Sequence, residues 1–69
     1  MLRMLEVVGT SPAGFSEAVR AAVEEIVRVG HAAHFFQVVE QRGSIRDGRI
    51  KEFQVVLKVA VENDHEPAS

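Results

Sequence analysis

Hydrophobic residues in this chain are spaced first two apart, then three and four apart, then two apart again, and each change predicts a new element. Residues 3–8 predict a short strand ending at Gly9, because aliphatic and branched side chains dominate this run. Leu5 and Val7 would project to one side of that strand, and the residues beside them to the other.

A helix is predicted from Ser11-Pro12 to about Val29. Ser11 can accept a hydrogen bond from a free amide of the first turn, and Pro12 suits the first helical position. Gly30 then suits the position just after the helix. Spacings of three and four residues place one apolar stripe on this helix, formed by Phe15, Ala18, Val19, Ala22, Val23 and Ile26.

Charged residues occupy the other side of this helix. Glu24 and Arg28 are four residues apart and predict an ion pair. Glu17, Glu24 and Glu25 could bind cations between symmetry-related copies, but a solvated helix face is the better interpretation.

The second half of the chain predicts a β-hairpin. Residues 35–45 and 50–61 read as strands, and apolar residues alternate cleanly in the second of them. Asp47-Gly48 lies between them and favours a type I′ turn, in which both central residues need positive φ. The element order is therefore β-α-β-β. With the last strand in the middle, the chain forms a three-stranded antiparallel sheet packed on one helix, an α+β fold.

An uninterrupted hairpin ladder predicts which residues share the side of the sheet that the helix leaves open. Glu40 and Arg42 would lie on the helix-facing side under this register. The open side would carry opposed pairs, namely Phe35 with Ala60, Gln37 with Lys58, Val39 with Val56, and Gln41 with Gln54.

An open side of this composition needs to be buried against something. A second subunit is the favoured interpretation. A flat aromatic ligand held between subunits is the alternative, since Phe35 offers a stacking face and a glutamine amide offers both a donor and an acceptor.

The size and composition of the chain also favour burial against a second subunit. A chain of 69 residues buries little of its surface alone, and it contains no cysteine that could form disulfides or thiolate metal sites. Oligomerisation is therefore expected. The net charge of −2 disfavours nucleic acid as a partner. No apolar run is long enough to span a bilayer and the first residues do not resemble a signal peptide, so we expect a cytoplasmic protein without a membrane partner.

Other candidate sites are weaker. His31 and His34 are three residues apart, but they follow Gly30 in a connection, and we predict no metal site there. Residues 9–11 could bind an anion before the helix, although helix capping is the better interpretation. Because no arrangement typical of a nucleophile or an acid/base pair is present, we expect no catalytic residues and no enzyme activity.

Three stretches make the sequence resemble the dodecin family. They are Glu-Val-Val-Gly-Thr-Ser-Pro at residues 6–12, Phe-Phe-Gln-Val continuing to Arg42-Gly43, and Phe-Gln-Val-Val-Leu-Lys-Val at residues 53–59. The order, length and spacing of these stretches carry the resemblance over nearly the whole chain, apart from a shortened N-terminus. It implies one dodecin-like domain at residues 1–62. The polar composition of residues 63–69 separately predicts a frayed tail.

The resemblance also implies an assembly and a ligand. Dodecins form hollow homo-dodecamers that store, buffer or photoprotect flavins such as FMN or riboflavin without catalysis. Phe35 matches the stacking tryptophan, Gln54 the glutamine at the flavin's polar edge, and Arg42 a position suited to a flavin phosphate. Gln37 matches a residue near the site that is usually glutamate.

Two of these matches depart from the family pattern. Phenylalanine is a smaller stacking platform than tryptophan, so we expect weaker flavin binding and poorer quenching of flavin fluorescence. A structural or ion-binding shell without flavin is the main alternative, and a regulatory or adaptor domain that binds protein at its sheet edge is a third. The resemblance leaves open which flavin is bound.

Overall fold

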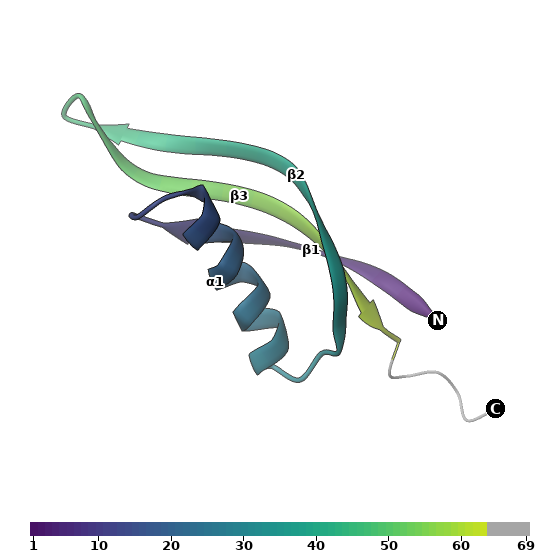
Figure 1. Cartoon of the computed structure of the whole chain (residues 1–69). Helices are drawn as coiled ribbons and strands as arrows, with labels where there is room; N and C mark the ends of the chain where they lie inside the picture. Colours follow the sequence, from purple (N-terminus) through teal and green to yellow (C-terminus); the bar gives the residue numbers. More distant parts are fainter. Residues whose placement is uncertain (64–69) are drawn as a thin grey trace.

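The computed structural model describes residues 1–63 and has the predicted element order. Strand β1 (Leu2–Ser11) leads into helix α1 (Phe15–Arg28), which is followed by strands β2 (Ala33–Arg46) and β3 (Arg49–Glu62). The helix lies on one side of the sheet, and the β2–β3 hairpin extends well beyond it (Figure 1). No helix within residues 1–63 is long and apolar enough to cross a membrane.

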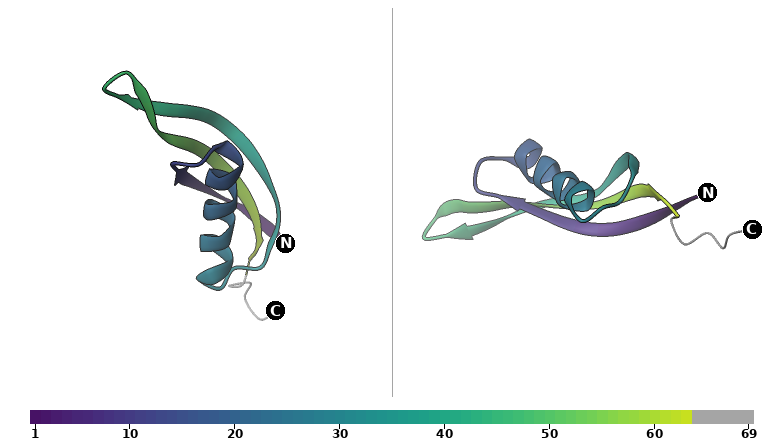
Figure 2. Two further views of the ribbon diagram at one scale, coloured as in Figure 1. Left: turned by 60° about the vertical axis from the view of Figure 1, so that its left-hand side comes forward. Right: turned by 90° about the horizontal axis from the view of Figure 1, so that it is seen from below.

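Strand β3 lies in the middle of the sheet, as predicted, with β1 and β2 antiparallel to it on either side. All three strands are longer than the sequence pattern indicated. Because β1 is short and β3 is long, the distal part of the hairpin has no third strand beside it. The chain is accordingly elongated, with principal extents of 56 × 20 × 14 Å, and its sheet curves around the helix (Figure 2).

The core lies between α1 and the alternate residues of β3. Leu57 and Val55 are fully buried, and they pack with the apolar helix stripe and with Leu5 and Val7 of β1. The buried helix residues are Ala18, Ala22 and Ile26. Small side chains on the helix allow a close approach to the sheet. A Cβ atom on Gly9 would lie 2.1 Å from the carbonyl oxygen of Ala18, so only glycine fits at that position.

The two ends of the helix differ in how well the sequence predicted them. The helix begins at Phe15 after Gly14, which provides no side-chain cap. Ser11 is therefore not the N-cap, contrary to prediction. It ends β1, and its Oγ accepts a hydrogen bond of 3.0 Å from the amide of Ala13. Pro12 correspondingly lies before the helix and not in its first turn.

The C-terminal end follows the prediction. Gly30 has φ of 105° and donates to the carbonyl of Val27, while His31 donates to the carbonyl of Ile26. These two hydrogen bonds form a Schellman motif, which satisfies carbonyls left free by the last turn.

The predicted Glu24–Arg28 pair is replaced by a pair one residue shorter. Arg28 donates to Glu25 at 2.5 Å, and both side chains are mostly exposed. This hydrogen bond and the charge of Glu25 raise the pKa of the Arg28 guanidinium.

The hairpin turn is the predicted one. Asp47 and Gly48 have φ of 53° and 76°, the positive values that a two-residue type I′ turn requires. Arg46 opposes Arg49 directly beside this turn.

Three irregularities interrupt the β2–β3 ladder, and they correct part of the predicted register. Lys51 on β3, and Val39 and His34 on β2, each lie opposite no residue of the other strand. Between Lys51 and Val39 the pairing is shifted by one residue, so Arg42 opposes Gln54 and Glu40 opposes Val56. The predictions that Glu40 and Arg42 face the helix are therefore wrong, and so are the predicted pairs of Gln41 with Gln54 and of Val39 with Val56. Beyond Val39 the predicted pairing returns, with Phe35 opposite Ala60, Gln37 opposite Lys58, Phe36 opposite Val59, and Val38 opposite Leu57.

The predicted tail lies almost entirely outside the described residues. The amide of Asn63 donates to the carbonyl of Met1 at 3.0 Å, which continues the β1–β3 pairing by one more hydrogen bond. Residues 64–69 of the predicted tail are outside the part of the chain that the structure describes.

Candidate functional site

The side of the sheet without a helix, called here the open face, carries the candidate site. Cross-strand partners in an antiparallel sheet project to the same side, so the register assigns this face. Its members alternate with the core residues of β3. They are Met4, Glu6, Val8 and Thr10 on β1, Phe35, Gln37, Glu40 and Arg42 on β2, and Glu52, Gln54, Val56, Lys58 and Ala60 on β3.

Apolar residues on the outer strands of the open face are well exposed. Val8 is 56% exposed, Phe35 is 56% exposed and Met4 is 44% exposed. Val56 and Ala60, in contrast, are buried because flanking strands shield the central one. The apolar residues of the open face are thus buried on the central strand and accessible on the outer strands.

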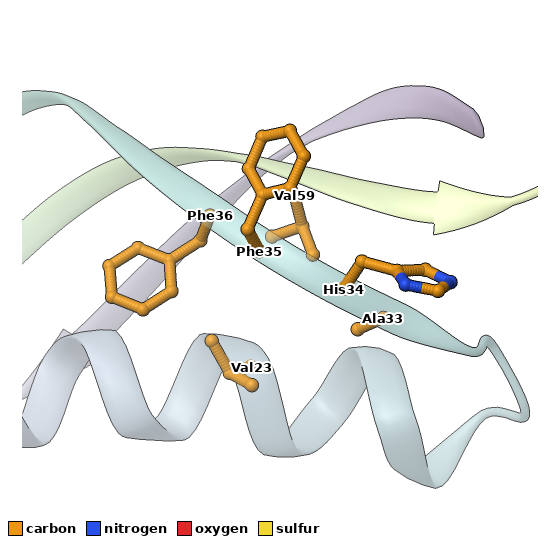
Figure 3. Close-up of a pocket in the computed structure, with 6 residues that line it drawn as sticks. All are labelled: Val23, Ala33, His34, Phe35, Phe36 and Val59. Carbon is orange, nitrogen blue, oxygen red and sulfur yellow. The ribbon is translucent and has the colours of Figure 1, made fainter.

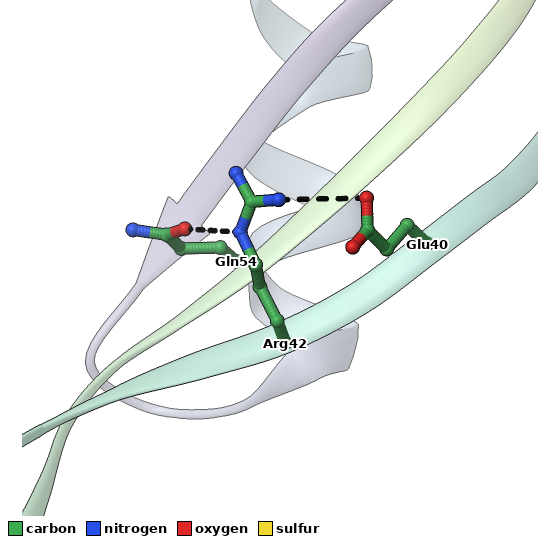
Figure 4. A network of polar contacts seen from close by, with 3 residues as sticks. All are labelled: Glu40, Arg42 and Gln54. Atoms are coloured by element: carbon green, nitrogen blue, oxygen red, sulfur yellow. Dashed lines mark hydrogen bonds and ion pairs between the residues drawn. The ribbon is translucent and has the colours of Figure 1, made fainter.

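A chain of polar contacts occupies one end of this face. The Arg42 guanidinium donates from Nε to Oε1 of Gln54 at 2.9 Å, and one terminal nitrogen lies 3.4 Å from Oε1 of Glu40 (Figure 4). The Gln54 amide nitrogen donates in turn to Oε1 of Glu52 at 3.2 Å. Two predicted site residues, Arg42 and Gln54, are therefore in direct contact, and two carboxylates join them.

Phe35 lies toward the other end of the same face. Figure 3 shows its ring pointing away from the helix, while the ring of Phe36 points to the opposite side of β2. Phe35 opposes Ala60, which is six residues from Gln54 along β3. At a rise of about 3.3 Å per residue, the two positions are about 20 Å apart in one chain. The fold places them on one face without bringing them together.

Gln37 lies between these two ends. It opposes Lys58, and Glu6 opposes Lys58 from the other strand. The middle of the open face therefore carries an amide, an ammonium group and a carboxylate in one cross-strand row.

His34 is a potential site residue that sequence reasoning left without a partner. Its Nε2 lies 2.7 Å from Oε2 of Glu62, and both side chains are about half exposed. His34 is also the unpaired residue at this end of the β2–β3 ladder, which alternation alone does not reveal. His34 also borders a hollow of about 110 Å³ between α1 and β2, whose other lining residues are Val23, Ala33, Phe35, Phe36 and Val59 (Figure 3). Among residues 1–63, no three histidine, aspartate or glutamate side chains are grouped closely enough to suggest a metal site.

Known proteins with this fold share its sequence pattern. The family model described as Dodecin matches residues 1–64. This chain belongs to the dodecin family. The dodecin of Thermus thermophilus is 39% identical over 57 residues, which cover 83% of each chain. The structure of dodecin from Streptomyces coelicolor is 41% identical, with a TM-score of 0.85 over 88% of this chain and 87% of that one.

Variants of the Thermus thermophilus dodecin give a finer comparison. A crystal structure from that organism is 36% identical to this chain, with a TM-score of 0.83 over 88% of this chain and 90% of that one. The identity is 38% for a variant with tryptophan changed to phenylalanine, and 34% for one with an arginine changed to alanine. One residue contributes a little under two percentage points over this length. Each substitution therefore changes the identity by about one residue. This is the change expected if this chain has phenylalanine at the substituted tryptophan position and arginine at the substituted arginine position.

A calcium dodecin from Mycobacterium tuberculosis, described as having a novel calcium-binding site, shares the fold with a TM-score of 0.81. At 21% identity it supports the architecture alone.

Proposed function

We propose that this chain forms a closed homo-oligomer of the dodecin type, a hollow dodecamer, that binds a flavin between the open faces of neighbouring copies. The observation that carries the proposal is the placement of Phe35, Gln54 and Arg42 on one uncovered face. Phe35 stacks on the isoalloxazine ring, and Gln54 and Arg42 contact its polar edge. Gln37 borders the site.

The separation within one chain supports a shared site. About 20 Å between Phe35 and Gln54 exceeds the length of a flavin's three fused rings. Two open faces related by a two-fold axis bring Phe35 of one copy toward the partner subunit's Gln54. The exposed edges of the face supply the apolar surface that such pairing buries.

The chemistry of the site favours holding a ring over transforming it. An aromatic face and a carboxamide provide stacking and hydrogen bonds. Neither is an acid or base that could move a proton at neutral pH. We therefore propose storage, buffering or photoprotection of the flavin without catalysis. The single domain at residues 1–62, the polar tail at residues 63–69 and the cytoplasmic location stay predictions.

The test compares two neighbouring phenylalanines on opposite sides of β2. Purified protein is titrated with riboflavin and with FMN while flavin fluorescence is recorded. Stacking on one aromatic ring contributes about 1–3 kcal/mol, so Phe35→Leu should weaken binding by about 5- to 150-fold. Phe36→Leu, on the helix-facing side, is the matched control and should change it less than about 2-fold. Unchanged flavin fluorescence with the parent protein at excess ligand contradicts the proposal.

The second candidate is a structural or ion-binding shell that has lost flavin binding. The observation that favours it is phenylalanine in place of the family's tryptophan, which leaves a smaller ring for stacking. This candidate predicts a large particle in size-exclusion chromatography, no flavin binding, and a rise in melting temperature on adding calcium. An adaptor domain would instead elute as a monomer or dimer.

A further inference from the structure

The tip of the β2–β3 hairpin, defined here as residues 45–51, exposes an apolar pair away from the open face. Strand β1 ends at Ser11 opposite Phe53, so the sheet has only two strands beyond that point (Figure 1). Ile45 opposes Ile50 there, and the two side chains are 74% and 62% exposed. A two-stranded hairpin is only marginally stable in water, so a surface of this kind needs cover.

The isoleucine pair lies on the same side of the sheet as the helix but beyond it. Ser44 opposes the open-face residue Glu52, so Ile45, the next residue along β2, projects to the helix-facing side. Helix α1 begins only at Phe15, whose ring contacts that of Phe53 at a centroid distance of 4.9 Å. The core that α1 covers therefore stops short of the tip.

The tip is also basic. Arg46, Arg49 and Lys51 against the one carboxylate of Asp47 give it a net charge of +2, so the rest of the chain, whose total is −2, carries −4. Arg46 opposes Arg49 directly, and like charges at opposed positions repel. Within residues 1–63, none of these three cations pairs with a carboxylate. A surface that suits the tip is therefore both apolar and acidic.

Two ways of covering the tip are excluded by distance and charge. The turn and the end of β3 are separated by a strand of 14 residues, about 43 Å in length, whereas residues 64–69 span at most about 22 Å fully extended. The same chain's C-terminal residues therefore cannot reach its own tip. A symmetric contact between two tips would oppose two surfaces of like charge, which is costly.

We propose that the hairpin tip docks on an acidic surface of another copy of this chain, as a second interface separate from the open face. The inference rests on the proposed function, in which the open face supplies the first interface. A two-fold contact joins one open face to one other and stops at two copies, so twelve copies need a further contact. A heterologous contact at the tip closes into rings and links the open-face pairs into a shell. Flavin binding and shell closure then depend on different surfaces.

The test measures particle mass and flavin binding on the same preparations. Ile45→Thr combined with Ile50→Thr removes the apolar surface but keeps β-branched residues in both strands. Light scattering should show a particle mass reduced about six-fold, from twelve copies to two. The two-copy particle should bind riboflavin within about 2-fold of the parent affinity, because the substitutions are distant from Phe35. Val29→Thr, at an exposed valine just after α1, is the matched control and should leave the mass unchanged.

Arg49→Glu distinguishes an interface from a purely structural role of the tip. The introduced carboxylate would pair with Arg46 across the strands and stabilise the hairpin within one chain. The same change removes the basic charge of the tip, so the two-copy particle should accumulate at protein concentrations at which the parent is fully assembled. If the tip only holds the hairpin together, this variant assembles as well as the parent or better, and that result overturns the inference.

The inference and the proposed function fail in different ways. Tip variants that keep the parent mass overturn the inference and leave flavin binding unaffected, and so does a parent particle of only two copies. A parent of twelve copies that falls to two in the tip variants, with flavin bound in neither, supports the inference and contradicts the proposed function. Far-UV circular dichroism of each variant should match the parent, since both isoleucines are mostly exposed.

Discussion

The two sides of the sheet differ both in composition and in what covers them, because the helix-facing side has an aliphatic core and the open face mixes apolar side chains with polar ones. On the helix-facing side, Leu57 and Val55 have no exposed surface because α1 lies directly over them. On the open face, Val8 and Phe35 each keep more than half of their surface exposed. The helix-facing side completes its core within the chain, and we propose that a second copy covers the open face. Under the proposed function, folding depends mainly on the helix-facing side and binding on the open face.

The largest expected effect is on the covered side. Leu57→Ala removes a fully buried side chain and should lower the free energy of unfolding by about 2–5 kcal/mol, measured by chemical denaturation. Val8→Ala is the matched change on the open face. It should cost less than about 0.5 kcal/mol in a dissociated chain and more in the oligomer. Equal costs for both variants in a monomer would remove the contrast between the faces.

Introducing a charge on the open face should break assembly without unfolding the chain. Val8→Lys places an ammonium group where a neighbouring copy would bury an aliphatic side chain, and an unpaired buried charge is costly. Size-exclusion chromatography with light scattering should show a smaller particle, while the far-UV circular dichroism spectrum keeps the helix and strand content of the parent protein. A particle of unchanged mass would mean that this edge of the face is not buried.

Restoring tryptophan at the stacking position should sharpen the binding role of the open face. Phe35→Trp enlarges the ring and adds an electron-rich indole, so flavin affinity should rise several-fold, by no more than about 1.5 kcal/mol. The fluorescence of the bound flavin should fall by a larger factor than the factor by which the affinity rises. A Phe36→Trp variant, facing the helix side, should reproduce neither change.

The smallest effect is expected outside both faces, on the exposed side of α1. Glu25→Gln removes the partner that raises the pKa of Arg28. A raised arginine pKa adds stability at every pH below the pKa of the unfolded state. This stability is lost only as the pH rises through the pKa of the folded state. The contribution is therefore constant across neutral pH. The melting temperature should barely move, and a large drop would show that this helix face is also buried.

Much of the fold follows from local sequence. Asp47-Gly48 predicts its turn because few other residue pairs adopt positive φ at two successive positions. The alternation of residues 53–61 predicts a central strand with one side on the helix, and the structure has it there. The ring of Phe35 also points away from the helix, as the hairpin register predicts.

The rest could not be derived from local pattern because it depends on tertiary contacts. Ser11 looks like a helix cap, but it pairs with Phe53 as the last residue of β1, and the helix begins only at Phe15. The irregularities of the β2–β3 ladder fall at Lys51 and Val39. Neither position is a glycine or proline, the residues that would predict a bulge from sequence. The irregularities move Arg42 to the side of the sheet opposite to the one predicted, and alternation alone cannot count an unpaired residue.

The unpaired residue at Val39 gives strand β2 one residue to spare. Phe35 and Arg42 are seven positions apart, and strict alternation would send them to opposite sides of the sheet. Because Val39 is unpaired, the alternation is shifted by one residue there, and both side chains project to the same side. Removing Val39 would leave six positions between them, an even number, so both would still face outward along a straighter strand. A deletion of one residue should therefore be tolerated here. In the evenly paired strand β1, the same deletion would move the core side chains beyond it to the open face.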